Sequence, residues 1–239
     1  MPQFKPVQKA DPTIIANQKR EVVRNGVHTG ADHLSVTAMI QRLGTDEVRR
    51  IAAELGLARS ARSVRRWRYE GRVPHSLISE MVKRVDQIDR MGGTEAAAEE
   101  IGVPVEAVEA WTTSPDAELP EPATEAVTHH DRAESRTRAG IPVDRTGRPT
   151  RTPRLVISGH ASVKGESSSD DDERDRSVNV TIDEDLADSI LTATESGDLD
   201  SALQAAEEYL STEHAGCSGY GEDFGWHWES LDAFELKWD

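Results

Sequence analysis

Apolar residues recur at spacings of three and four over residues 36–111, and this is the period of one face of an α-helix. The first two runs contain Val36, Met39, Ile40 and Leu43, and then Val48, Ile51, Ala52 and Leu55. Thr45 is a suitable N-cap for the second run, and Gly56 a suitable stop, because glycine readily adopts the left-handed conformation that ends helices. The pattern predicts consecutive short helices.

Two segments of this helical region are similar in sequence. Residues 44–67 read GTDEVRRIAAELGLARSARSVRRW, and residues 93–111 read GTEAAAEEIGVPVEAVEAW. Each runs from Gly-Thr through an Ala-rich helix to a Leu-Gly-Leu or Ile-Gly-Val turn, and then to a short helix with Val before Trp. We predict an internal repeat of helix-turn-helix units, with Val64 and Trp67 facing inward in the first copy.

The segment between Thr113 and Pro153 has too few apolar residues to bury a core, and its Pro, Thr, Glu and Arg content is typical of a mobile linker. His129 and His130 precede Asp131 here, but adjacent histidines in a flexible segment are usually incidental, so we expect no metal site. The second half is basic, which indicates either a solvated linker or additional phosphate contacts. Its arginines are Arg136, Arg138, Arg145, Arg148, Arg151 and Arg154.

The pattern changes to an alternation of apolar and polar residues in the last third of the chain. Residues 155–163 and the SVNVTI segment have strand character and are joined by an acidic loop that contains SSSDDD. Residues 183–210 have helical spacing with a break at Gly197-Asp198. Two final strands are predicted from the alternation of Phe224, Trp226 and Trp228, and of Phe234, Leu236 and Trp238.

These patterns predict an α+β protein with several domains. The expected parts are an N-terminal arm (1–35), a helix-turn-helix (36–90), a second, acidic helix-turn-helix-like repeat (91–113), a disordered basic linker (114–153) and an acidic α+β association domain (154–239).

The composition of the chain indicates its cellular location and shows where its charge is concentrated. The 239 residues carry a net charge of −16, and the acidity is concentrated after residue 165, as in a halophile-like composition poor in lysine. No run approaches the roughly 18 apolar residues of a membrane span, so we expect a cytoplasmic, nucleoid-associated protein without a membrane partner. The single cysteine, Cys217, excludes an internal disulfide and a cysteine-based metal cluster.

Arginine is concentrated in residues 55–72, where Glu70 is the only acid. Guanidinium groups on the second helix of a helix-turn-helix can reach phosphates or guanine edges in the major groove, and the alternative is a solvated arginine face. The second copy presents Glu106 and Glu109 instead, so we expect it to keep the fold without reading DNA and to pack against the first copy or another subunit. The candidate DNA-binding residues are Arg59, Arg62, Arg65, Arg66, Arg68 and Arg72.

Signals for enzymatic chemistry are weak. The chain lacks a phosphate loop, a nucleophile elbow and a metalloprotease motif. His227 lies between two tryptophans of a predicted strand and is expected on the exposed face. The aspartates of the SSSDDD loop are more readily explained as solvated than as magnesium ligands. We expect no enzyme activity, no cofactor and no bound metal.

The repeat motifs and the order of the parts resemble the telomere-protecting terminal proteins of actinobacterial linear replicons. That resemblance implies binding to DNA ends, recruitment of a replication apparatus, and a side-chain hydroxyl that becomes linked to the terminal nucleotide. The matching loop reads GESSSDDD, so the hydroxyl would belong to Ser167, Ser168 or Ser169. Here the loop carries serines where the family carries threonine, and an extra helix-turn-helix precedes the matching one.

Residues 177–210 also resemble a ribbon-helix-helix module. That resemblance implies a strand that pairs with its twin in a dimer, with Asn179 and Thr181 on its outward face. Because this part of the chain is strongly acidic, it favours dimerisation or protein recognition over a second DNA contact.

We therefore expect a non-enzymatic protein that binds double-stranded DNA, forms a homodimer and engages a replication or other protein partner through its acidic C-terminal domain. The leading role is a terminal-protein-like factor at replicon ends or at an origin. The alternatives are a helix-turn-helix transcription regulator with a C-terminal dimerisation domain, and a structural interaction protein that binds no DNA.

Overall fold

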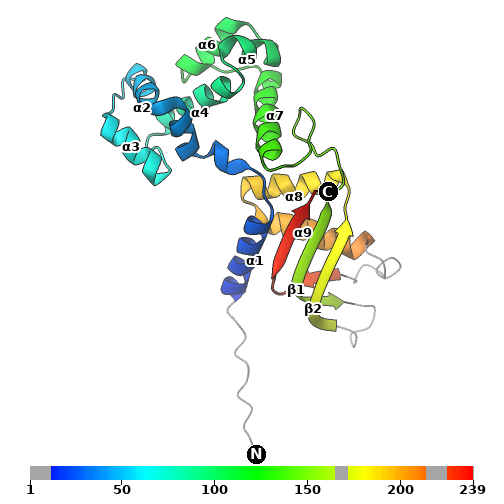
Figure 1. Ribbon diagram of the computed structural model, residues 1–239. Helices are drawn as coiled ribbons and strands as arrows, with labels where there is room; N and C mark the ends of the chain where they lie inside the picture. Colours follow the sequence, from blue (N-terminus) through cyan, green and yellow to red (C-terminus); the bar gives the residue numbers. More distant parts are fainter. Residues whose placement is uncertain (1–11, 165–171, 214–224, 239) are drawn as a thin grey trace, which may run out of the picture. The chain divides into compact units, whose positions relative to one another are not determined.

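The computed structural model describes residues 12–164, 172–213 and 225–238 and divides the chain into two compact units (Figure 1). Unit 2 comprises Gly30–Arg148. Unit 1 comprises the flanking segments Met1–Thr29 and Pro149–Asp239. Unit 2 is helical and unit 1 combines helices with an antiparallel sheet, so the expected α+β fold class is confirmed.

The helices of unit 2 include both predicted helix-turn-helix units. Their bounds are η1 (Ala31–Leu34), α2 (Val36–Glu54), α3 (Ala61–Glu70), α4 (Ser76–Arg90), α5 (Thr94–Ile101), α6 (Val105–Thr113) and α7 (Glu121–Arg138). Gly44 interrupts α2 with φ 81° and ψ 163°, so residues 45–54 act as a separate helix before α3. Gly56, at φ 68°, ends that helix as predicted.

The repeat is longer than the sequence comparison predicts, because it extends into a third helix. Residues 45–54, α3 and α4 form module 1, and α5, α6 and α7 form module 2. Ile78 and Val82 of α4 are buried in the core of module 1, and Ala123 and Val127 lie 45 residues later in the core of module 2. The apolar spacing of the third helix is therefore repeated as well.

The predicted disordered linker over residues 114–153 is wrong, because residues 114–148 belong to compact unit 2 and include a helix. Residues 121–138 form α7. Its first turn contains a proline and Glu121 and its last turn contains Arg136 and Arg138, and residues of these types at these two ends stabilise a helix. Arg136 is fully buried and donates to the carbonyl oxygen of Gly147 at 2.8 Å. Composition alone was misleading because the buried side of α7 combines Ala123 and Val127 with the polar residues Ser135 and Arg136, so a helix with few apolar residues is packed nonetheless.

The separate N-terminal arm is also wrong, since residues 12–26 form α1 (Pro12–Gly26) and belong to unit 1. Lys19 donates to the carbonyl oxygen of Trp228 at 2.8 Å. A Cβ atom on Gly26 would lie 1.9 Å from the carbonyl oxygen of Phe234, so only glycine allows α1 to approach this strand.

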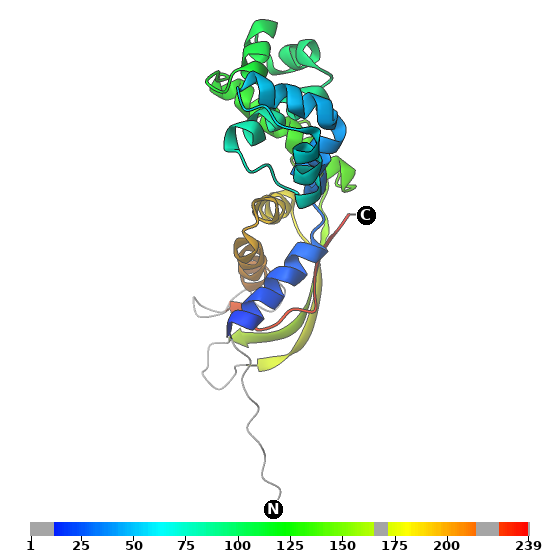
Figure 2. The ribbon, with the colours of Figure 1, turned by 90° about the vertical axis from the view of Figure 1, so that its left-hand side faces the viewer.

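The sheet of unit 1 contains the predicted strands: β1 (Arg154–Lys164), β2 (Asp172–Thr181), β3 (Gly225–Trp228) and β4 (Ala233–Lys237). Central β1 pairs with β2 along one edge, and with β4 and β3 end to end along the other. The predicted helical pair is α8 (Glu184–Ser196) and α9 (Leu199–Glu213), which lie on the same side of the sheet as α1 (Figure 2). The helices cover the face that carries Leu155, Ile157 and Ala161.

The strand that resembles a ribbon-helix-helix ribbon has a partner inside the chain. β2 pairs with β1 from Arg154↔Thr181 to Val163↔Asp172, so one edge of this strand is occupied within the chain. Asn179 and Thr181 are exposed, as expected. Trp228 is fully buried and His227 is exposed, as expected for neighbouring positions on a strand.

Candidate nucleic-acid interface

Helix α3 has well-defined ends. Its N-cap, Ser60, accepts a hydrogen bond from the backbone N–H of Ser63 at 3.2 Å, and Gly71 follows the helix in the left-handed conformation at φ 67°. Val64 is fully buried and Trp67 is 5% exposed, so these two side chains fix α3 against the core of module 1. The opposite side of α3 faces solvent.

That solvent side carries a continuous basic and aromatic surface. Arg62, Arg65, Arg66 and Tyr69 follow the i, i+3, i+4, i+7 spacing of one helical face, and we call them the α3 arginine face. All four are exposed, and Tyr69 is 92% exposed. The remaining predicted DNA-binding residues are also exposed, on the flank of the helix or just beyond its ends: Arg68, Arg59 and Arg72.

Most of this positive charge is not neutralised within the chain. Arg66 forms an ion pair with Glu70 at 2.7 Å, and this hydrogen bond raises the pKa of Arg66. In the described ranges, no carboxylate oxygen lies within 4.0 Å of four of the other arginines, namely Arg62, Arg65, Arg68 and Arg72. Their guanidinium groups therefore remain available to an anionic ligand.

The corresponding helix of module 2 has the same geometry and the opposite charge. Aligning Trp67 with Trp111 also aligns Val64 with Val108 and the N-caps Ser60 and Pro104. This alignment places Glu106 at the position of Arg62 and Glu109 at the position of Arg65. Ala110 and Thr113 complete the matching face, which we call the α6 acidic face: Glu106, Glu109, Ala110 and Thr113.

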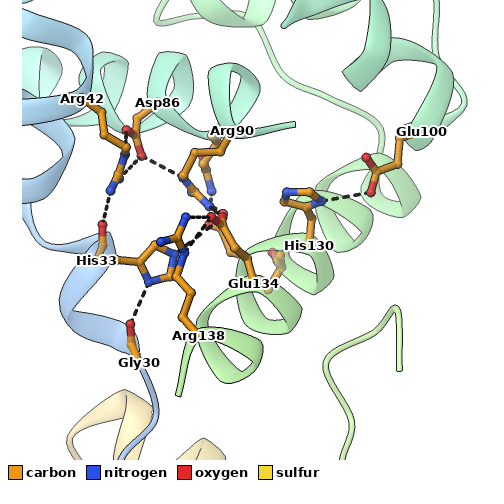
Figure 3. Close-up of polar contacts among 12 residues, drawn as sticks. Gly30, His33, Arg42, Asp86, Arg90, Glu100, His130, Glu134 and Arg138 are labelled. Carbon is orange, nitrogen blue, oxygen red and sulfur yellow. Dashed lines mark hydrogen bonds and ion pairs between the residues drawn. The ribbon is translucent and has the colours of Figure 1, made fainter. Parts of the chain in front are cut away.

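A buried ionic network joins the two modules (Figure 3). The carboxylate of Asp86 is fully buried and accepts hydrogen bonds from Arg42 at 2.8 and 2.7 Å and from Arg90 at 3.0 Å. Arg90 in turn forms ion pairs with Asp131 and, at 2.5 Å, with Glu134 of α7. The network links α2 and α4 of the first half of unit 2 to α7 of the second.

The opposite charges within the network stabilise each other's ionised forms. Partial burial opposes the charged form of Glu134, but hydrogen bonds from Arg90 and Arg138 outweigh it and lower its pKa to about 2. Burial also opposes the charge of Arg90, yet its carboxylate partners raise the pKa of the guanidinium. Both groups therefore stay ionised near neutral pH, and the modules of unit 2 are held in one arrangement.

The guanidinium group of Arg84 holds the connection between α6 and α7 in module 2. The Arg84 guanidinium lies 5.3 Å from the ring centroid of Trp111. It also donates to the carbonyl oxygens of Trp111, Ser114 and Ala117 at 3.1–3.2 Å. Arg84 thus stabilises the connection between α6 and α7 and is not available to a ligand.

The other sequence-based candidates are not brought together. His130 lies on α7 and contacts Glu100 at 3.0 Å. Within the described ranges, no three His, Cys, Asp or Glu side chains are grouped so as to hold a metal ion. Ser167, Ser168 and Ser169 lie outside the described residues.

Two features of the site escaped the sequence analysis. Tyr69 belongs to the α3 arginine face, and its helical spacing from Arg62 and Arg65 was the available signal. Asp86 follows Ile78 and Val82 at spacings of four on the apolar side of α4. A charged residue at such a position signals a buried ion pair.

Comparison with known proteins identifies no relative: no family model matches the chain, and no curated protein or solved structure is significantly similar to it. In the part of the chain that the structure describes, no helix has the length and apolar composition required to cross a membrane.

Proposed function

We propose that this chain binds double-stranded DNA through the α3 arginine face. The observation that carries the proposal is the contrast between the two modules. They share the fold and the buried Val and Trp positions, yet only α3 presents exposed arginines. Since α6 forms without any basic residue, the arginines of α3 are not required by the fold and are explained by a ligand.

The chemistry of the face suits a DNA groove. A major groove admits one α-helix, and guanidinium groups on that helix can bind phosphate oxygens or the O6 and N7 atoms of guanine. Arg62, Arg65 and Arg66 supply these groups on adjacent turns. Tyr69 adds an aromatic ring and a hydroxyl, which can contact a thymine methyl group or a phosphate.

The proposal is tested by fluorescence anisotropy with a labelled duplex of mixed sequence over a range of salt concentrations. The variant R62A/R65A/R66A should lose most of its affinity. Each phosphate contact contributes about −0.9 to the slope of log K against log salt, so the slope should become shallower by about 2.7 if all three arginines contact phosphates. Circular dichroism should show unchanged helicity, because all three side chains are exposed.

A matched control removes the same number of positive charges from basic residues that already have carboxylate partners. Its three substitutions are R20A, R50A and K237A, at residues paired with Asp200, with Glu47 and Glu54, and with Glu235. The control should retain the slope and nearly all of the affinity. Equal losses in both triple variants would mean that net charge, rather than the α3 arginine face, is responsible, and the proposal would be abandoned.

The biological role is a finer proposal within DNA binding. A terminal-protein-like role at replicon ends is supported by the resemblance described above and predicts DNA that stays attached through denaturing purification and nuclease treatment. A nucleoid-associated transcription regulator instead predicts sequence-specific binding to an internal operator without a covalent adduct. If the chain binds no duplex even at low salt, it acts as a structural interaction protein.

A further inference from the structure

The positions that define the α3 arginine face are the same positions that define the α6 acidic face, with the charge reversed. Arg62 and Arg65 occupy one face of α3, three residues apart, and Glu106 and Glu109 occupy the equivalent face of α6 with the same separation. We propose that the α6 acidic face of one copy of this chain docks on the α3 arginine face of a second copy.

The spacing of the charges fits this contact. When two helices lie antiparallel, residues three apart on one meet residues three apart on the other in reverse order. Arg62 then lies opposite Glu109, and Arg65 lies opposite Glu106. The small Ala110, which follows Glu109 and lies one turn after Glu106, permits a close approach.

Both charged faces are available for such a contact. In the described ranges, neither Glu106 nor Glu109 has a Lys, Arg or His nitrogen within 4.0 Å, just as Arg62 and Arg65 have no carboxylate neighbour. Residues 94–128 contain nine acids and no Lys, Arg or His, so no neighbouring base in the sequence competes for the glutamates. Complementary potentials of this kind set specificity and speed association.

The two faces lie on different helices of unit 2, so the contact is heterologous. Each copy can offer one acidic face and one basic face, and the contact can therefore repeat from copy to copy. The contact itself does not depend on DNA. Competition between DNA and α6 for the same arginines, in contrast, rests on the proposed function.

The test uses the full chain without DNA and measures the weight-average mass by sedimentation against protein concentration. At about 20 mM salt the Debye length is near 20 Å and the wild-type mass should rise with concentration, whereas at about 500 mM it should stay monomeric. Two charge-reversal variants, R62E/R65E and E106R/E109R, should each lose the association by about tenfold or more, because like charges then face each other. Circular dichroism verifies that both variants are folded.

Mixing the two variants gives the decisive result. The mixture contains an intact acidic face on R62E/R65E and an intact arginine face on E106R/E109R, together with a reversed pair, so association should return. A wild-type mass that stays monomeric at low salt overturns the proposal, and so does a mixture that fails to associate. Neither outcome depends on whether the chain binds DNA, since the anisotropy assay above measures that separately.

Discussion

Replacing Asp86 with alanine should destabilise unit 2 by removing the carboxylate at the centre of its ionic network. The side chain is fully buried and accepts three hydrogen bonds, two from Arg42 and one from Arg90. The substitution leaves two guanidinium groups with fewer acceptors. Arg90 keeps Asp131 and Glu134, whereas Arg42 keeps only the carbonyl oxygen of His33 among the acceptors described for it.

The size of the effect follows from the burial of these groups. Breaking a buried ion pair by removing one partner costs about 3–5 kcal/mol, and the lower end applies because the Arg42 side chain is 27% exposed and can regain water. Unit 2 has about 120 residues, and an unfolding entropy of about 2.1 cal/mol/K per residue then converts 3 kcal/mol into a decrease in Tm of about 12 °C.

The measurement is thermal unfolding followed by circular dichroism at 222 nm, with hydrogen exchange of α4 peptides to assign the loss to unit 2. Asp46→Ala is the matched control, because Asp46 is 93% exposed and pairs with Arg49 at 3.1 Å. An exposed pair contributes about 0–1 kcal/mol, so this control should lower Tm by no more than about 4 °C. If the Asp86 and Asp46 variants lose equally little stability, the network does not hold the modules together.

Two further predictions concern pH and backbone contact. The pKa of Glu134 is lowered from an ordinary 4.5 to about 2, so the stability it contributes is present above pH 4.5 and is lost as pH falls toward 2. In urea titrations at pH 5 and pH 3, Glu134→Gln should lose less stability on acidification than the wild type, and parallel losses would exclude this linkage. Gly26→Ala should expose α1 to faster hydrogen exchange, because its Cβ atom would meet the carbonyl oxygen of Phe234 at 1.9 Å. Gly225→Ala serves as the control, since its nearest neighbour lies at 3.9 Å, and similar exchange in both variants would contradict the close-contact interpretation.

The helices that the sequence predicted are those whose partners lie nearby in the chain. Ile51 and Ala52 pack with Val64 and Trp67 in one cluster, so spacing within a few turns was sufficient to place α2 and α3. The arginine positions followed directly, because any residue opposite Val64 and Trp67 must face solvent. For these elements local pattern and tertiary packing agree.

The helices that were missed depend on distant polar partners. Gln87 contacts Asp131 across 44 residues, and Lys19 contacts Trp228 across 209 residues. Neither contact leaves an apolar period in the sequence. The stretch that contains α7 therefore looked unfit for burial, although a proline and Glu121 in its first turn and Arg138 in its last turn were usable signals.

The position of α1 has a consequence for the order of folding during synthesis. The ribosome completes all of unit 2 by Arg148, whereas α1 packs against β4, which ends at Lys237. Domains generally fold as they emerge from the ribosome, so unit 2 can fold before β4, the strand against which α1 packs, has been synthesised. Unit 2 can thus fold before unit 1 can form. A nascent chain stalled after Arg148 would carry a folded unit 2, preceded by a helix α1 that has no strand to pack against.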